Sequence, residues 1–195
     1  YLRFLRWIPF LRMVSVCNNL AFSNVRAGSD IDLFIIASNG HLFMVRVLTV
    51  VMLHVLGVRL HGKKIAGRFC LSFFVDDSFL NLSSIAIEND VYLKLWIKTL
   101  VPVIDDGVSK DFFVANAWAD ENLDQLPWGS GQSFSDMNRK SGVKYILEKV
   151  MGGRFGRFIE RILKKCQLER ARNKALKLAD ASGIIINDHI LKFHE

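Results

Sequence analysis

Two aspartates separated by one residue, Asp30 and Asp32, stand at the head of the apolar run from Leu33 to Ala37. Side chains alternate between the two faces of a strand, so residues i and i+2 point to the same side. Two carboxylates this close repel each other, and a divalent cation keeps both ionised. Carboxylate oxygens suit Mg²⁺. The spacing predicts joint Mg²⁺ binding; the alternative is that Ser29-Asp30 caps a turn and Asp32 is exposed.

Three short apolar runs predict the strands that position these carboxylates. They lie at Met13–Cys17, Ile31–Ala37 and Phe69–Val75. Between the second and third runs, His41–Leu56 is a mostly apolar segment that predicts a helix ended by Gly57. Strands that alternate with helices indicate an α/β or α+β protein with a small mixed β-sheet flanked by helices. We expect the three strands to be neighbours in the sheet.

The rest of the chain is predicted to be mainly helical. Apolar spacing predicts a helix from Glu88 to Val101 that Pro102 ends, and a short helix over Asp111–Ala119. Two basic amphipathic helices follow, broken at Gly152-Gly153, and a last short strand is expected at Ile184–Ile186. Residues 19–22 are expected to start a short helix, and residues 127–135 are predicted to be a linker. A first domain is predicted at 1–126 and a basic helical C-terminal region at 136–195. The two basic helices of that region are predicted at 142–151 and 155–179.

A longer pattern surrounds the two aspartates. The run Val14-Ser15-Val16-Cys17 continues as Asn18-Asn19-Leu20-Ala21, and a spacer leads to Ser29-Asp30-Ile31-Asp32-Leu33-Phe34. This order resembles the motif of the minimal nucleotidyltransferase (polymerase-β-like) superfamily, and in particular its bacterial nucleotidyltransferase-domain proteins. The motif covers residues 13–37.

The resemblance implies both a reaction and a set of site residues. The reaction is Mg²⁺-dependent transfer of a nucleoside monophosphate from a nucleoside triphosphate, such as ATP, to a hydroxyl acceptor. Asp30 and Asp32 would be the catalytic metal ligands. Asn18, Asn19 and Ser29 would line the turn that contacts the nucleotide phosphates.

Two departures from the motif keep a second hypothesis open. The family's Gly-Ser turn is Asn18-Asn19 here. The family also has a third metal-binding carboxylate on the third strand, and in this chain that strand carries Ser72 and no acid. Asp76 and Asp77 follow that strand, and capping of the next residues is their expected role. The alternative function is therefore a catalytically impaired, nucleotidyltransferase-like module that binds nucleotide or RNA. A third carboxylate near Asp30 and Asp32 would favour catalysis, and its absence would favour the binding module.

Positive charge is concentrated in the C-terminal third of the chain. Residues 139–177 hold thirteen Lys or Arg and three Glu, a net charge of +10, whereas the whole chain carries +7. Arg154–Lys177 is expected to be a basic helix with one apolar stripe. It could bind the phosphate backbone of RNA or attach to anionic lipid. The structural alternative is that the helix docks on the first domain and its charged face is simply solvated.

Composition places the chain among folded globular proteins. Hydrophobic residues make up 51% and charged residues 23% of the 195 residues. The three cysteines lack metal-ligand spacing and are interpreted as reduced thiols of a cytoplasmic protein. The apolar run from Val47 to Val58 is too short to span a bilayer, so no membrane span is expected.

Overall fold

A computed structural model of the chain describes residues 1–17, 28–60, 65–87, 90–120, 142–175 and 185–192. Some predictions fall on residues outside these ranges: Asn18 and Asn19, the helical start at 19–22, the linker at 127–135, residues 176–179 of the second basic helix, Glu88 and Ile184. The described residues form a mixed α+β structure, as expected from the alternation of strands and helices.

Six strands form one mixed sheet in the spatial order β4-β1-β2-β3-β6-β5. β2 pairs antiparallel with β1 and parallel with β3, while β4, β6 and β5 extend the two edges through antiparallel pairs. The strands are β1 (Leu11–Cys17), β2 (Ile31–Ala37), β3 (Phe69–Asp76), β4 (Val101–Asp105), β5 (Ile185–Ile186) and β6 (Ile190–Lys192). The prediction of three neighbouring strands is confirmed, with β2 in the centre.

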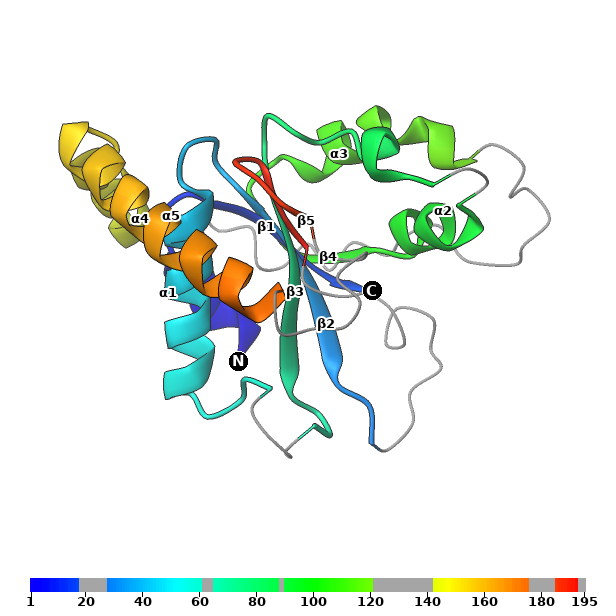
Figure 1. Cartoon of the computed structure of the whole chain (residues 1–195), viewed down its shortest axis with the longest axis horizontal. Coiled ribbons are helices and arrows are strands. Elements are labelled where there is room, and N and C mark those ends of the chain that lie inside the picture. Colours follow the sequence, from blue (N-terminus) through cyan, green and yellow to red (C-terminus); the bar gives the residue numbers. More distant parts are fainter. Residues whose placement is uncertain (18–27, 61–64, 88–89, 121–141, 176–184, 193–195) are drawn as a thin grey trace.

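Helices cover both faces of the sheet and make a three-layer arrangement (Figure 1). One face carries η1, α1, α4 and α5, and the other carries α2, α3 and the short turns η3 and η4. These elements are η1 (Leu2–Trp7), α1 (Leu42–Val55), η3 (Ser83–Ile85), α2 (Val91–Lys98), α3 (Ser109–Ala115), η4 (Ala117–Asp120), α4 (Gly142–Met151) and α5 (Arg154–Ala175). The break between α4 and α5 lies at Gly152-Gly153, as predicted.

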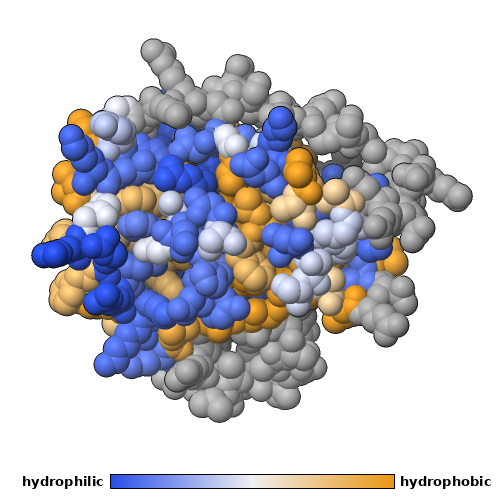
Figure 2. Space-filling view, turned by 90° about the horizontal axis from the view of Figure 1, so that it is seen from above, coloured by the Kyte–Doolittle hydropathy of each residue, from blue (hydrophilic) through white to orange (hydrophobic). Residues whose placement is uncertain are grey.

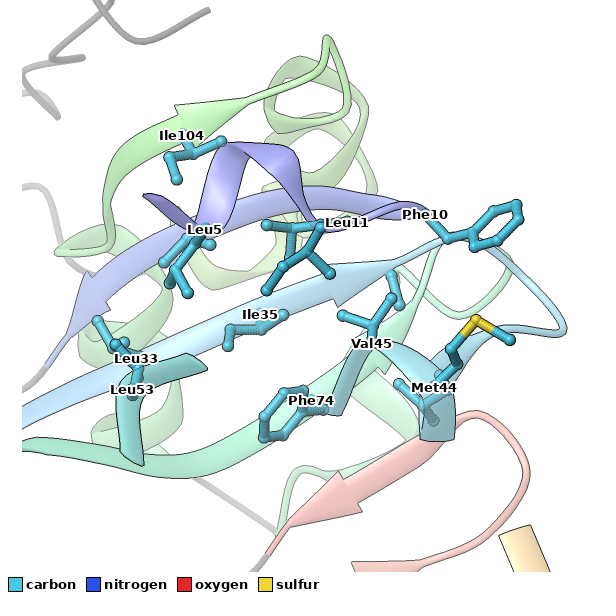
Figure 3. Packing of buried hydrophobic residues seen from close by; sticks show 14 of the residues in the cluster. Leu5, Phe10, Leu11, Leu33, Ile35, Met44, Val45, Leu53, Phe74 and Ile104 are labelled. Atoms are coloured by element: carbon cyan, nitrogen blue, oxygen red, sulfur yellow. The ribbon is translucent and has the colours of Figure 1, made fainter. Parts of the chain in front are cut away.

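The apolar run of β2 is buried on both sides because helices cover both faces. On one side Leu33 and Ile35 join a cluster with Val45 and Leu53 of α1 and with Phe74 of β3 (Figure 3). Because strand residues alternate between faces, Phe34 and Ile36 of β2 belong to the other cluster.

Phe34 is the centre of this second cluster. Its ring lies 5.3 Å from that of Phe73, 5.2 Å from that of Trp96 and 5.2 Å from that of Phe112, measured between centroids. These partners come from the neighbouring strand β3 and from α2 and α3, so one aromatic side chain of the sheet contacts both helices that cover this face. The face that carries Phe34 is also the face of Asp32, two residues earlier.

The prediction that Pro102 ends a helix is wrong. α2 ends at Lys98, and Pro102 lies inside β4, where it pairs with Ser15 at the edge of the sheet. Proline lacks a backbone N–H and is tolerated on an edge strand, where one side of the ladder is open. The register is irregular between Val14 and Ser15 of β1, next to this pair.

Buried polar groups attach the C-terminal helices to the rest of the fold. Glu148 of α4 accepts a hydrogen bond from the Phe10 backbone N–H at 2.7 Å. Glu160 of α5 accepts hydrogen bonds from the backbone N–H groups of Phe43 and Met44, both at 2.8 Å. These N–H groups belong to the first turn of α1, so a carboxylate from a distant helix caps α1. Within the described residues, no helix combines the length and the apolar character needed to cross a membrane.

Candidate functional site

Asp30 and Asp32 lie at the start of β2. Asp30 directly precedes the strand and Asp32 is its second residue, so the extended conformation predicted for Asp32 is confirmed. Main-chain hydrogen bonds hold this start to the chain before β3: Ile31 N–H donates to Arg68 O at 2.8 Å, and Gly67 N–H donates to Ser29 O at 2.9 Å. Asp32 is buried, with 9% of its surface exposed, and Asp30 is half-buried.

The sheet register places a cysteine on each side of Asp32. Cys17 of β1 and Cys70 of β3 are its partners across the antiparallel and parallel pairs. Residues in register across neighbouring strands point to the same face of a sheet. Asp32 and the two thiols therefore form a row across three strands, on the face that α2 covers.

A bulge at Ser72 follows this row along β3. Leu33 pairs with Leu71, whereas Phe34 pairs with Phe73, so Ser72 is passed over in the ladder. The extra residue reverses the alternation. Cys70 and Phe73, three residues apart, consequently belong to the same face, and the apolar core begins directly beside the polar row.

Asp30, Asp32 and Cys70 form a cluster that could hold a cation. One ligand atom from each, a carboxylate oxygen or the sulfur, lies within 4.8 Å of the other two. Opposite oxygens around Mg²⁺ are about 4.2 Å apart, so a small side-chain movement would bring both carboxylates to one ion. Within the described part of the chain, this is the one such group of three His, Cys, Asp or Glu residues, and it contains no third carboxylate.

Burial and the two aspartates both raise the pKa values of the thiols beside Asp32. Burial, together with the negative charges of Asp32 and Asp30, raises the pKa of the Cys70 thiol to about 12. Burial also raises the pKa of the Cys17 thiol, with a smaller contribution from the charge of Asp32. Both thiols are therefore neutral at physiological pH. The protonated thiol of Cys70 hydrogen-bonds the carboxylates, in place of a third carboxylate that would repel them.

Residues of α2 form one wall of this region. Tyr92 is largely exposed, and its phenol has a raised pKa because of partial burial and the charge of Asp32. Trp96 is buried and its side chain hydrogen-bonds Cys17. Tyr92 is a residue that sequence reasoning missed. Its position at the start of a helix was visible in the sequence, but its proximity to Asp32 depends on how α2 packs.

The other predicted site residues divide into two groups. Ser29 is half-buried beside Asp30, and its backbone joins the loop before β3. Asn18 and Asn19 lie outside the described residues. Cys70 was assigned no role in the site from the sequence, and its pairing with Asp32 required knowledge of the strand register.

Asp76 and Asp77 lie at the opposite end of β3 from Cys70, because Asp76 pairs with Ala37, the last residue of β2. Asp76 lies six residue steps along the strand from Cys70, which is about 20 Å. Asp76 accepts hydrogen bonds from the backbone N–H and the hydroxyl of Ser78 at 3.0 and 2.6 Å, so its expected capping role is confirmed. Neither aspartate supplies the missing third carboxylate.

Comparisons of the chain with models of protein families, with curated proteins and with solved structures gave no match.

Proposed function

We propose that the protein is a divalent-cation-dependent nucleotidyltransferase that transfers a nucleoside monophosphate from a nucleoside triphosphate to a hydroxyl acceptor. The observation that carries the proposal is the position of Asp30 and Asp32 at the start of a central strand, with ligand atoms within 4.8 Å of each other. The motif around them resembles that of the polymerase-β-like superfamily, and a mixed sheet with helices on both faces is the architecture that this resemblance implies.

The donor set fits a hard cation bound together with its substrate. Mg²⁺ in phosphoryl-transfer sites uses one or two carboxylates, with substrate phosphates and waters as the remaining ligands. Asp30 and Asp32 provide the two carboxylates, while the neutral Cys70 sulfur is a poor ligand for Mg²⁺. When bound, the cation would neutralise the triphosphate and stabilise the charge that develops during transfer.

The protein residues would orient the reactants in the following way. Asp30 and Asp32 would hold the metal–triphosphate at the end of the sheet where β2 begins. The acceptor hydroxyl would then attack the α-phosphorus and lose its proton to water as the new P–O bond forms. Pyrophosphate would leave with the bridging oxygen as the bond between that oxygen and the α-phosphorus breaks. The exposed ring of Tyr92 offers a surface on which a nucleobase can stack.

Cys70 supports a second candidate function, a nucleotide-binding module of the same fold without transferase activity. A third carboxylate would support two-metal catalysis, and the described residues place a thiol there instead. A module that binds one cation and its nucleotide needs only the two aspartates.

Calorimetric titration with Mg²⁺–ATP and Mn²⁺–ATP tests the site common to both candidates. Asp30→Asn and Asp32→Asn should each weaken binding at least tenfold, because each removes a charged ligand from the cation. Asp111→Asn is the matched control, because it makes the same charge change at an exposed position on α3. Equal affinities of wild type and Asp32→Asn for the metal–nucleotide would show that Asp32 is not part of the binding site.

Transfer of label from α-phosphate-labelled nucleoside triphosphate to RNA or to the protein itself distinguishes the two candidates. The transferase predicts metal-dependent labelling that Asp32→Asn abolishes. It also predicts faster labelling in Cys70→Asp, which adds a third carboxylate, than in Cys70→Ala. Nucleotide binding without labelling in wild type and in Cys70→Asp would establish the binding module.

A further inference from the structure

α4 is an amphipathic helix that docks through its polar face. Lys144 is buried with 6% of its surface exposed, and its ammonium donates hydrogen bonds to the Leu11 carbonyl and to Asp106, the latter at 3.1 Å. One turn further, Glu148 accepts the hydrogen bond from the Phe10 backbone. The helix is therefore held to the start of β1 by charged groups, which is the reverse of the usual arrangement in a globular protein.

The apolar face of α4 is left in solvent. Its residues follow the i, i+3, i+4, i+7 spacing of a single helical stripe, and each is between 37% and 64% exposed. They are Val143, Ile146, Leu147 and Val150.

The outward side of α5 continues this apolar character. Gly156, Glu160 and Gln167 form its buried side, where Glu160 and Gln167 bond to the first turn of α1. Phe155 and Phe158 lie on the exposed side, at 63% and 60% exposure. Ile162, one turn beyond Phe158, is 46% exposed.

Cations surround the apolar side chains of both helices. Among the described side chains of α4 and α5, the exposed ionised residues are six cations, Lys149, Arg154, Arg157, Arg161, Lys165 and Arg170, and one anion, Glu169. Hydrophobic and strongly hydrophilic surfaces lie next to each other on the side of the molecule that carries these helices, at the left of Figure 2. The seven exposed apolar residues and the six cations are called the α4–α5 surface below.

We propose that the α4–α5 surface binds the interface of an anionic lipid membrane. A lipid interface satisfies both of its components: the apolar side chains enter the boundary between headgroups and acyl chains, and the cations contact the acidic headgroups. The binding is peripheral, since neither helix is able to span a bilayer.

The composition of the α4–α5 surface favours anionic lipid over RNA and over a second copy of the chain as its partner. RNA phosphates would pair with the cations but leave the aliphatic stripe of α4 in water, because Val, Ile and Leu offer no ring on which a base can stack. A second copy would cover the apolar residues but bring two sets of six cations together, with little opposite charge to offset them. Only the lipid interface matches the apolar stripe and the positive charge together.

Vesicle flotation of the full chain tests the proposal. Wild type should float with vesicles that contain phosphatidylglycerol and remain unbound with pure phosphatidylcholine. The triple variant Ile146→Ser, Val150→Ser, Phe158→Ser should bind about a hundredfold more weakly, since it removes three inserting side chains. Its matched control replaces three apolar residues that are even more exposed and lie elsewhere in the chain, Val55, Ile87 and Val114, by serine and should bind as wild type does.

The charge contribution has its own pair of variants. Arg157→Gln with Arg161→Gln should weaken binding about thirtyfold, from a factor of about five for each cation lost at an anionic surface. Arg3→Gln with Lys110→Gln, two exposed cations on other elements, should have no effect.

A fluorophore at Cys166 gives an independent reading of insertion. Cys166 is exposed on α5, one turn beyond Ile162, whereas Cys17 and Cys70 are buried. Emission from an environment-sensitive label there should shift to shorter wavelength on addition of anionic vesicles.

Three results would overturn the proposal. The first is equal flotation of wild type and the apolar triple variant, and the second is no binding of wild type to anionic vesicles. The third is salt-sensitive binding of single-stranded RNA that the apolar variant retains in full, which would assign the cations to a nucleic acid. None of these results depends on nucleotide binding at Asp30 and Asp32.

Discussion

Replacement of Glu160 by alanine should destabilise the fold far more than replacement of any exposed glutamate. The Glu160 carboxylate is 8% exposed, and each of its oxygens accepts one hydrogen bond from the first turn of α1, at 2.8 Å from Phe43 N and Met44 N. His41, the N-cap residue of α1, makes no side-chain capping bond. Glu160 therefore satisfies two N–H groups that the helix itself leaves unpaired.

The expected cost follows from these contacts. Leaving a buried N–H without an acceptor costs about 1–3 kcal/mol, and two are lost together in Glu160→Ala. The favourable contact between a carboxylate and the N-terminus of a helix adds roughly 0.5 kcal/mol. We expect a decrease of about 3–4 kcal/mol in the free energy of unfolding, allowing for incomplete additivity. The free energy of unfolding of Glu160→Gln should lie between those of wild type and Glu160→Ala. Its amide oxygen can accept a hydrogen bond from one N–H, while its NH₂ group faces the other.

Urea unfolding at neutral pH, followed by circular dichroism, measures this difference. Glu169→Ala is the control, since Glu169 is exposed on the same helix. Equal midpoints for Glu160→Ala and Glu169→Ala would refute the reasoning, because they would show that the carboxylate contributes nothing as a cap.

The pH dependence of Glu160 has a definite sign. Burial raises its pKa above the ordinary value of 4.5, against the smaller lowering effect of the two backbone hydrogen bonds. Between 4.5 and the raised pKa, the folded state binds more protons than the unfolded state, so stability falls as pH rises through that window. The stability advantage of wild type over Glu160→Gln should therefore shrink from pH 4 toward pH 7. An advantage that grows with pH would show that the hydrogen bonds outweigh burial.

Two further predictions concern the glycines near the junction of α4 and α5 and the Cys70 thiol of the candidate site. Gly156→Ala should lower the free energy of unfolding by more than about 2 kcal/mol, because a Cβ there would lie 1.5 Å from the Met151 carbonyl oxygen. Gly153→Ala, which has open space around its Cβ position, should change it by less than about 1 kcal/mol in urea titration, and similar losses in both would contradict the steric argument. Iodoacetamide at pH 8 should alkylate the exposed Cys166 and spare Cys70, since a pKa of about 12 leaves roughly one thiolate in ten thousand. Peptide mass spectrometry would reveal the contrary result, equal labelling of both.

The sequence alone determined the elements with strong local patterns. β2 was predicted with its observed bounds because Ile31–Ala37 is a continuous apolar run, and α4 because Gly142 and Gly152 flank a helical pattern. The shared side of Asp30 and Asp32 also followed from local geometry, since alternation in a strand needs no knowledge of its neighbours.

Only the tertiary structure decided which distant residues meet. Cys70 lies beside Asp32 because β2 and β3 pair in one particular register, and a shift of one residue would turn its side chain to the other face. β4 was missed because Pro102 is a local helix terminator, and its edge position is a property of the sheet. The sequence shows the apolar spacing of α4, but it does not show that the apolar side is exposed, because an amphipathic sequence does not specify which face docks. That choice depended on Lys144 and Glu148 finding partners at Leu11, Asp106 and Phe10, more than 35 residues away along the chain.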